Sequence, residues 1–394
     1  MNEVYIAGYT RTAFSRSRPN DPERDIFNSI RMDDALGMLI KEIVKKSGVN
    51  TREIGDVITG SALQAGENWL YGGRHPALLA GLPFEVPSMA MDRACASSLN
   101  AIAVGAMEIM TDNSDIVIAG GMEHMTHVPL SNNNRIEPCF KLMLRPEYMH
   151  YGMSIGYNMG LTAEKLSAVS GIGKTEMDQF SVRSHKLAGE TNETGWFKGE
   201  ITPVEVEYNG STVKVDTDQS IRKDTTIEQI SKLPPAFKPD GVITAGNSSP
   251  LNAGATAMML MSEKKIKEYG VTPLGKITGM AWAGVEPDLM GKGPVPASNK
   301  LLNKLGLKVE DIDYWEINEA FAVVPLYAAQ QLNIDIDRIN VHGGAVAIGH
   351  PLGATGVRLA GTVARILNDN KKERAIATLC VGGGQGFSIA IERC

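Results

Sequence analysis

The chain has 394 residues, of which 43% are hydrophobic and 21% are charged, the balance of an ordinary globular protein. Because this length exceeds a single typical core, we expect two or three packed units. The formal net charge of -6 argues against a broad basic surface, so nucleic acid is not an expected partner. No run of apolar residues approaches the length that crosses a membrane, so membrane insertion is not expected either.

The four cysteines show neither the paired spacing of a zinc site nor the density of a disulfide framework. They are Cys95, Cys139, Cys380 and Cys394. A strand-like run at residues 4–8 leaves no room for a targeting peptide. We therefore expect a reducing, cytoplasmic location and no bound metal.

Two distant segments follow one plan, which reads as strand, turn, helix, strand and glycines. The first comprises residues 86–92, Cys95, an apolar helix through Met110, residues 115–119 and glycines 120–121. The second comprises residues 340–346, His350, an apolar helix through Leu367, residues 375–379 and glycines 382–384. The shared order predicts two α/β halves related by an internal repeat, each with a sheet and buried helical crossovers.

The sheet pattern is interrupted between these segments, from about residue 122 to residue 246. This stretch holds a helix that we predict at residues 174–191 and an alternating strand at 204–215, with polar loops around both. Core composition returns at residues 256–261. The pattern indicates an inserted region.

Cys95 follows a predicted strand and begins a predicted helix, among small residues. Free backbone N–H groups and the helix dipole favour an anion there, and a nearby imidazole can take the proton, so we expect a lowered thiol pKa and a nucleophile. The alternative is a buried structural cysteine.

Cys380 ends another apolar strand and opens onto the glycine-rich run 381–386. Backbone N–H groups of such a turn can hold a developing oxyanion, while the thiol donates or accepts a proton beside it. The alternative is a tight turn beside an inert thiol. Cys139 and Cys394 lack such surroundings, and we interpret them as structural or surface residues.

Two further side chains suit this chemistry. Asn318 stands near a strand-to-helix junction, where its amide can hold a water or an oxygen, although an N-cap is the simpler role. His350 lies between glycines and Pro351, where an imidazole can move protons in a crowded cleft. The simpler interpretation of His350 is a loop histidine.

Taken together, these four positions resemble the thiolase family. Cys95 stands in Cys-Ala-Ser, Asn318 in Asn-Glu-Ala-Phe, His350 in Gly-His-Pro and Cys380 in Cys-Val-Gly, in that order. The likeness extends over nearly the whole chain, through residues 11–14, 120–125, 159–164 and 245–249.

The resemblance implies a five-layer αβαβα core built from two similar βαβαβαββ halves, with an inserted loop domain that binds coenzyme A. The corresponding ranges are 1–121 and 247–271 for the N-terminal half, 122–246 for the insertion, and 272–394 for the C-terminal half. It also implies a homodimer or homotetramer that acts on acyl-CoA and coenzyme A as substrates, with no permanently bound cofactor.

The resemblance also implies a role for each motif residue. Cys95 is the nucleophile that carries the acyl group, His350 activates it, and Cys380 moves the proton at the substrate's C2. One oxyanion hole is formed by His350 and a water on Asn318, and the other by the backbone N–H groups of Cys95 and Gly382. The coenzyme A site is expected at Arg222, Phe237, Ala245 and Ser249, and the acyl pocket at Met159, Met290 and Phe321.

Within the family, Asn158 favours the degradative 3-ketoacyl-CoA class, because biosynthetic acetoacetyl-CoA thiolases usually have a histidine there. An acetoacetyl-CoA thiolase working toward condensation remains the alternative. Ala253 replaces a usual acidic residue with no evident consequence. Cys380 argues against a ketoacyl synthase. The intact set of Cys95, His350 and Cys380 argues against a non-catalytic acyl-CoA-binding subunit.

Overall fold

The computed structural model describes residues 2–130, 133 and 136–394. The first sheet, called the N-terminal sheet, has the strand order β3-β2-β4-β7-β1. Its strands and the helices around them are β1 (Val4–Arg11), α1 (Met32–Ser47), β2 (Asp56–Gly60), α2 (Arg74–Leu79), β3 (Ser88–Met91), α3 (Ser97–Met110), β4 (Ile116–His124), β7 (Ala253–Ser262) and α9 (Glu263–Tyr269). Strands β3, β2 and β4 run parallel, and β7 runs antiparallel to both β4 and β1.

The second sheet, called the C-terminal sheet, continues the order as β8-β11-β10-β9. Its elements are β8 (Gly275–Gly284), α10 (Pro294–Leu305), β9 (Tyr314–Ile317), α11 (Val323–Leu332), α12 (Ala345–Ile348), α13 (Thr355–Asp369), β10 (Arg374–Val381) and β11 (Gln385–Glu392). The two sheets join where Val4–Ile6 of β1 pairs with Gly275–Ile277 of β8.

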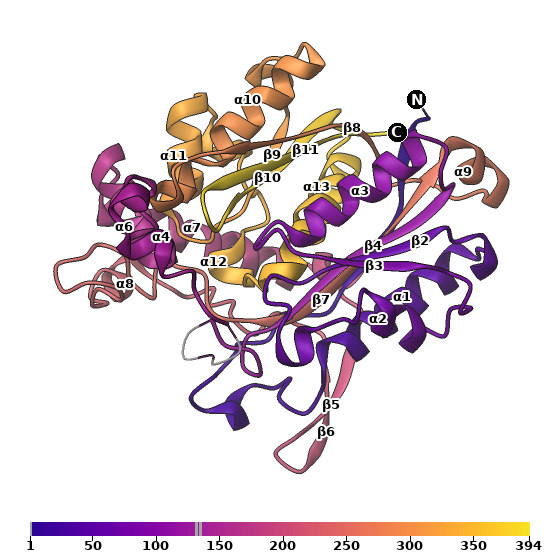
Figure 1. Ribbon diagram of the computed structural model, residues 1–394, viewed down its shortest axis with the longest axis horizontal. Helices are drawn as coiled ribbons and strands as arrows, with labels where there is room; N and C mark the ends of the chain where they lie inside the picture. The colour runs from indigo at the N-terminus through magenta and orange to yellow at the C-terminus, as the bar shows by residue number, and fades with distance from the viewer. Residues whose placement is uncertain (1, 131–132, 134–135) are drawn as a thin grey trace.

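The layers follow from the alternation of buried side chains along the strands. In β4, Ile116 and Ile118 face α1 and α2, whereas Val117 and Ala119 face the middle of the molecule. There α3 and α13 lie side by side between the sheets, and α10 and α11 cover the outer face of the C-terminal sheet (Figure 1). The predicted αβαβα core is therefore confirmed.

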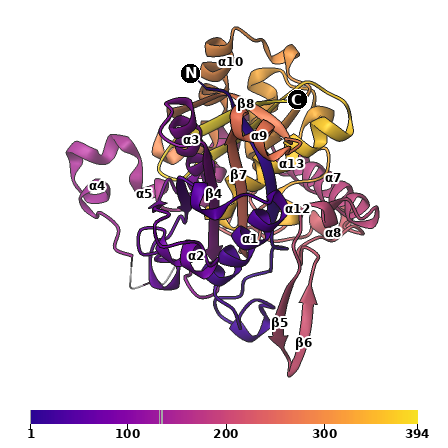
Figure 2. The ribbon, with the colours of Figure 1, turned by 90° about the vertical axis from the view of Figure 1, so that its right-hand side faces the viewer.

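The chain between β4 and β7 forms the remaining elements. They are α4 (Lys141–Leu144), α5 (Met153–Gly156), α6 (Met159–Ser170), α7 (Lys174–Glu193), β5 (Val204–Tyr208), β6 (Ser211–Val215) and α8 (Ile227–Ile230). The helix predicted at residues 174–191 is α7. The single strand predicted at 204–215 is wrong: Asn209 and Gly210 adopt positive φ and fold it into the hairpin that projects in Figure 2.

Short 3-10 helices complete the structure. They are η1 (Pro22–Arg24), η2 (Thr51–Glu53), η3 (Gly66–Asn68), η4 (Pro146–Tyr151), η5 (Trp196–Gly199), η6 (Pro287–Lys292), η7 (Val309–Asp311), η8 (Ile336–Arg338) and η9 (Leu352–Ala354). Among the described residues, none of the helices has both the length and the apolar character needed to cross a bilayer.

The predicted repeat is visible in the strand order, since β2-β4-β7-β1 corresponds to β9-β10-β11-β8 in order and direction. The strand predicted at residues 340–346, the counterpart of β3, is wrong. A single parallel bridge joins Ile339 to Trp315, and residues 345–348 form α12. Positive φ at Asn340 and Gly343 ends the extended run, and the Asn340 side chain bonds both the N–H and the C=O of Ile317 in place of a strand.

Gly356→Ala is expected to destabilise the protein, because a Cβ at this position of α13 would lie 2.2 Å from the backbone nitrogen of Leu99 in α3. The strain of forcing the middle helices apart costs about 1–3 kcal/mol, more than the ~1 kcal/mol that alanine gains as a helix former. Urea unfolding measures the difference. Gly284→Ala is the control, since a Cβ there meets open space. Equal stability of Gly356→Ala and the parent protein would contradict the predicted close packing.

Candidate active site

A strained turn presents Cys95 between β3 and α3. Ala94 adopts φ of +43°, a left-handed conformation that costs a non-glycine residue about 1–3 kcal/mol. Asp92 holds the turn by accepting the Ala94 N–H at 2.6 Å, and Ser97 Oγ donates to the Ala94 carbonyl at 2.7 Å. The side chain of Cys95 is 7% exposed, so it lies in the interior two residues before the helix begins.

His350 occupies the corresponding turn before α13. The preceding residue again has positive φ, here Gly349 at +117°, and a Cβ on it would collide with Asn252. The Asn252 side chain accepts the His350 backbone N–H at 2.8 Å and donates to the Ser15 carbonyl at 2.5 Å. The turn is therefore fixed from the N-terminal half, and the imidazole is 3% exposed.

The tautomer of His350 follows from its hydrogen bonds. Thr355 donates its hydroxyl hydrogen to the Pro351 carbonyl at 2.9 Å, so its oxygen is free to accept from His350 Nδ1, which lies 2.6 Å away. A proton on Nδ1 leaves the lone pair on Nε2. His350 can therefore act as a base through Nε2.

Asn318 lies against this imidazole. Its Nδ2 is 3.3 Å from His350 Nε2, and the residue is fully buried just after β9. Its Oδ1 is buried without a hydrogen-bond partner among the described residues. Such an acceptor is suited to a water, and the N-cap alternative is wrong, because α11 begins at Val323 with Ala322 at its N-cap.

Cys380 and Gly382 approach Cys95 from the C-terminal sheet. Cys380 is fully buried near the end of β10, and this burial raises the pKa of its thiol, with a smaller contribution from the charge of a Cys95 thiolate. The backbone N–H groups of Gly382 and of Cys95 itself lie near the Cys95 sulfur, where they oppose the effect of burial on the pKa of that thiol. The glycines after Gly382 adopt positive φ in the turn between β10 and β11, which lets this donor point inward.

In the site without substrate, the effect of burial on the pKa of Cys95 outweighs the opposite effect of those N–H groups. It raises the pKa of Cys95 to about 11, and a nearby Glu123 carboxylate adds to the shift. Burial also lowers the pKa of His350 to about 3, helped by the charge of Arg358. The expected lowering of the Cys95 pKa is therefore wrong. A neutral thiol and a neutral imidazole suit proton transfer during attack rather than a preformed ion pair.

The two groups of residues meet through the middle helices. Leu99 contacts Gly356, and Ser98 Oγ accepts the Val357 N–H at 3.1 Å. These contacts lie a few residues beyond Cys95 and His350. Since each turn leads directly into its helix, the contact between α3 and α13 sets the distance between the two side chains.

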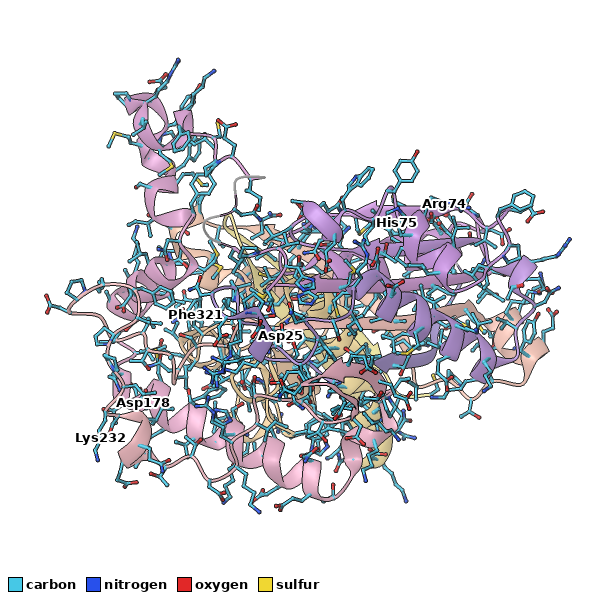
Figure 3. The ribbon with its side chains drawn as sticks, turned by 90° about the horizontal axis from the view of Figure 1, so that it is seen from below. Asp25, Arg74, His75, Asp178, Lys232 and Phe321 are labelled. Atoms are coloured by element: carbon cyan, nitrogen blue, oxygen red, sulfur yellow. The ribbon has the colours of Figure 1, made fainter. Side chains whose placement is uncertain are left out.

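The predicted acyl-pocket residues gather around Cys380. Met290 and Phe321 share a buried cluster with it, and Met159 packs against that cluster at the start of α6. A Cβ on Gly382 would lie 3.4 Å from Met159 Sδ. Phe321 lies toward the middle of the molecule in Figure 3, where it forms an edge contact with Phe237 at 5.9 Å between ring centroids. Apolar side chains thus surround Cys380.

Most of the predicted coenzyme A residues lie near this cluster. Phe237 is 38% exposed, and Ser249 donates through both its N–H and its hydroxyl to the Ala320 carbonyl at 3.0 Å. Ala245 is exposed in the same turn as Ser249. Arg222 has different contacts. Its side chain is exposed, and its backbone N–H donates to His185 Nδ1 at 3.2 Å.

Several polar residues at the site had no role in the sequence analysis. They are Glu123, Asn252, Glu319 and Thr355, all fully buried. Glu319 accepts from Ser184, Asn340 and the Val346 N–H, which steadies the chain on both sides of the site. Three of them stand inside the quoted motifs or within five residues of His350, which was the available signal, whereas Asn252 lies three residues beyond the motif at 245–249. Asn158, noted as a departure, caps α6 by accepting the Leu161 N–H at 3.1 Å.

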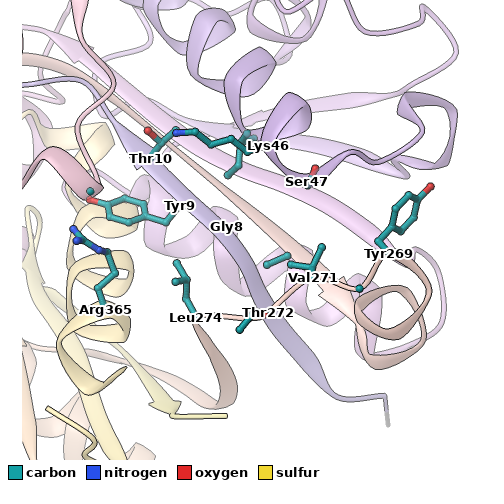
Figure 4. Close-up of a pocket in the computed structure, with 14 residues that line it drawn as sticks. Gly8, Tyr9, Thr10, Lys46, Ser47, Tyr269, Val271, Thr272, Leu274 and Arg365 are labelled. Carbon is teal, nitrogen blue, oxygen red and sulfur yellow. The ribbon is translucent and has the colours of Figure 1, made fainter. Parts of the chain in front are cut away.

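A separate pocket of about 460 Å³ lies away from these residues (Figure 4). It is lined by β1, the end of α1, the loop between α9 and β8, and Arg365 of α13. Arg365 lies ten residues beyond Thr355, about 15 Å along the helix. It already pairs with Glu200 at 3.2 Å and stacks on Trp196, so the pocket offers no free charge from this arginine.

Comparison with known proteins shows similarity to thiolases over nearly the whole chain. The family models for the thiolase N-terminal and C-terminal domains match residues 4–264 and 271–393. The chain is 39% identical to a 3-ketoacyl-CoA thiolase of Saccharophagus degradans, over 99% of this chain and 98% of that protein. It is also 39% identical to a probable acetyl-CoA acyltransferase of Staphylococcus aureus, over 93% and 94% of the two chains.

Solved structures agree. Human mitochondrial 3-ketoacyl-CoA thiolase superposes with a TM-score of 0.88 at 31% identity, covering 100% of this chain and 99% of that one. The same human enzyme in complex with CoA gives a TM-score of 0.87 at 32% identity, covering 100% and 98%. The chain therefore belongs to the thiolase family. It is an enzyme of the acyltransferase class.

The raised pKa of Cys95 predicts slow alkylation at neutral pH. Because only the thiolate reacts, the rate with iodoacetamide should rise about tenfold per pH unit from pH 7 to beyond pH 9. Mass spectrometry of the Cys95 peptide follows the reaction, with the exposed Cys139 peptide of the same digest as a check on the reagent. A rate that levels off below pH 8 would show that the turn stabilises the thiolate after all.

Proposed function

We propose that the protein cleaves 3-ketoacyl-CoA with coenzyme A, giving acetyl-CoA and a shortened acyl-CoA through an acyl-Cys95 intermediate. The observation that carries the proposal is the proximity of two buried thiols: a charge on Cys95 adds to the effect of burial on the pKa of Cys380, and the Gly382 N–H lies beside the Cys95 sulfur. This chemistry needs one thiol as nucleophile and a separate proton carrier at carbon. The names of the relatives support the same reaction.

The first half-reaction uses the turn that carries Cys95 and the turn that carries His350. Nε2 of His350 takes the Cys95 proton as the sulfur attacks the 3-keto carbonyl, and N–H donors hold the oxyanion. The C2–C3 bond then breaks, the acyl group stays on sulfur, and the electron pair leaves on C2 as the enolate of acetyl-CoA. Cys380 gives its proton to C2. Since burial raises the pKa of Cys380, that thiol keeps its proton until the enolate forms.

After the first half-reaction, the protonated His350 returns a proton to the Cys380 thiolate. In the second half-reaction, coenzyme A loses its thiol proton to Nε2 of His350 and attacks the thioester on Cys95. The shortened acyl-CoA leaves, and Cys95 recovers its proton from His350. Two oxyanions arise in the cycle. We assign one to His350 and a water on Asn318, and the other to the N–H groups of Cys95 and Gly382.

Substrate binding follows from the surroundings of the thiols. We assign the acyl chain to Met159, Met290 and Phe321, which bring apolar surface to Cys380. Coenzyme A is assigned to Phe237, Ala245 and Ser249, with Arg222 at the exposed outer end for a phosphate. The human relative in complex with CoA supports a coenzyme A site in this fold.

The proposal includes the division of the chain. Residues 122–246 form the insertion that binds coenzyme A, between an N-terminal half of 1–121 with 247–271 and a C-terminal half of 272–394. The return of the chain as β7, between β4 and β1, supports this division. A cytoplasmic place in fatty acid degradation fits the bacterial relatives, whose names specify 3-ketoacyl-CoA thiolase.

We also propose a homodimer or homotetramer. Large apolar side chains stand exposed around α2, including Trp69, Tyr71 and Phe84 at 52%, 60% and 78%. This surface lies on the opposite side of Figure 3 from Lys232, near the labelled Arg74 and His75. Exposed apolar patches of this kind mark protein interfaces. Light scattering on the purified protein gives the number of subunits, and a monomer at micromolar concentration would contradict the proposal.

Cys95→Ala is expected to lower the thiolysis rate at least about 1,000-fold, because the covalent route is lost. Incubation of the parent protein with acetyl-CoA should add one acetyl group to the Cys95 peptide. Cys380→Ser should still accept that acetyl group while losing thiolysis, since acyl exchange needs no proton at C2. Cys139→Ala is the control with parent activity. A Cys95→Ala variant that cleaves at the parent rate would refute the nucleophile.

Chain length distinguishes the two thiolase classes. If the degradative assignment is correct, kcat/KM for 3-ketoacyl-CoA should hold or rise from four to eight carbons or more, because each buried CH2 contributes about 0.8 kcal/mol in the apolar pocket. Thiolysis of a substrate series, followed at the absorbance of the 3-keto thioester, measures this. Activity confined to acetoacetyl-CoA would favour the acetoacetyl-CoA thiolase alternative.

A further inference from the structure

Glu123 is a fully buried carboxylate that the mechanism above does not use. It stands at the end of β4 and receives hydrogen bonds from five donors. They are Ala62 N at 2.8 Å, Leu63 N at 3.3 Å, Ser61 Oγ at 3.2 Å, Asn68 Nδ2 at 2.6 Å and Gly353 N at 2.9 Å. Four donors belong to the N-terminal half. The fifth, Gly353, comes from the loop that carries His350.

The Gly353 loop is seated in the N-terminal sheet with almost no free space. A Cβ on Gly353 would lie 2.4 Å from the Met122 carbonyl, and one on Gly121 would lie 2.1 Å from the Gly353 carbonyl. Gly353 is three residues beyond His350, and Cys95 is close enough for the Glu123 charge to raise its pKa. Glu123 thus bonds one catalytic loop and lies beside the other.

We propose that Glu123 is the positioning residue of the thiolase reaction, and that as an ionised carboxylate it holds the His350 loop at working distance from Cys95. This inference rests on the proposed function. Glu123 acts through the Gly353 N–H and touches no substrate. Its second effect is electrostatic, because a negative charge beside Cys95 keeps that thiol protonated until His350 removes the proton.

The set of partners requires the ionised form. Five donors meet the two oxygens, so a protonated carboxyl would place its own hydrogen against a donor. The only compensation is the buried Oδ1 of Asn68, which is unpaired among the described residues and could accept that hydrogen after an amide flip. Burial meanwhile raises the pKa of Glu123 to about 7, with the backbone donors opposing the shift. The hydrogen bonds that Glu123 accepts should therefore weaken as the pH falls below neutrality.

The other titratable groups near Glu123 have separate partners. His124, next along β4, faces the opposite side and bonds the Phe27 carbonyl, and Glu67, beside Asn68, bonds His127 at 2.7 Å. On the facing elements, Cys95 and His350 are neutral near pH 7, by their shifts to about 11 and about 3. The pKa of His127 is also raised, because its hydrogen bond to Glu67 and the charge of that carboxylate outweigh the effect of burial, but the hydrogen bond to the Gly353 loop is made by Glu123.

The test compares Glu123→Gln with the parent enzyme by two measurements. Glutamine keeps the shape but turns an NH2 group toward a donor, so kcat should fall about 10- to 100-fold while KM changes less than about threefold. Removal of the charge should also shift the alkylation profile of Cys95 to lower pH, so the thiol becomes more reactive as turnover falls. A purely structural residue would not produce these opposite changes.

Asp56→Asn is the matched control, because it makes the same carboxyl-to-amide change at the far end of the adjacent strand β2. Glu123→Asp restores the charge with a shorter reach, so its alkylation profile should stay at the parent position while kcat remains low. A parent-like kcat in Glu123→Gln, or an unmoved alkylation profile, would overturn the proposal. Alkylation is measured without substrate, so absent thiolysis in the parent enzyme would instead contradict the proposed function.

Discussion

The backbone contact between α3 and α13 is the constraint on which the rest of this structure depends. Leu99 and Gly356 leave no space for a side chain between the helices, so the two halves have one fixed spacing. Each helix begins just after a catalytic turn, so the spacing between the two helices also sets the spacing between the two turns. The flanking sheets, the outer helices and the Glu123 hydrogen bonds then surround a junction whose geometry is already determined.

Sequence reasoning found what local patterns encode. The repeat and α7 follow from hydrophobic periodicity, whereas the αβαβα class was implied by the resemblance to the thiolase family. The motifs that carry this resemblance singled out Cys95, Asn318, His350 and Cys380. Sequence reasoning failed where distant partners decide. The C-terminal counterpart of β3 is absent because the Asn340 side chain takes its place, whereas the hairpin turn at Asn209-Gly210 is a local signal that the sequence analysis missed. The Cys95 pKa depends on burial by elements far along the chain, which a helix-start argument omits.

The protonation states of Cys95, Cys380 and His350 agree with their apolar surroundings. Both thiols and the imidazole are uncharged at rest, so the apolar surroundings contributed by Met290 and Phe321 carry little electrostatic cost. Charge appears only when the sulfur attacks, and N–H donors are already aligned for it. Such preorganisation avoids the reorganisation that water would need at the same moment. A cysteine that held its charge permanently would need compensating partners, and these would crowd an acyl chain.

The two repeats differ at the position of β3, and this difference gives the two edges of the sheet separate roles. The N-terminal half keeps β3, whose outer edge completes no further pairing in the described chain. The C-terminal half has no such strand, and Gly343 and Gly344 lie instead against α7, where Ser184 Oγ accepts the Gly344 N–H at 3.0 Å and a Cβ on Gly343 would meet the Ser184 backbone. In the C-terminal half, the position that β3 occupies in the other repeat is therefore used to bind α7 of the intervening segment.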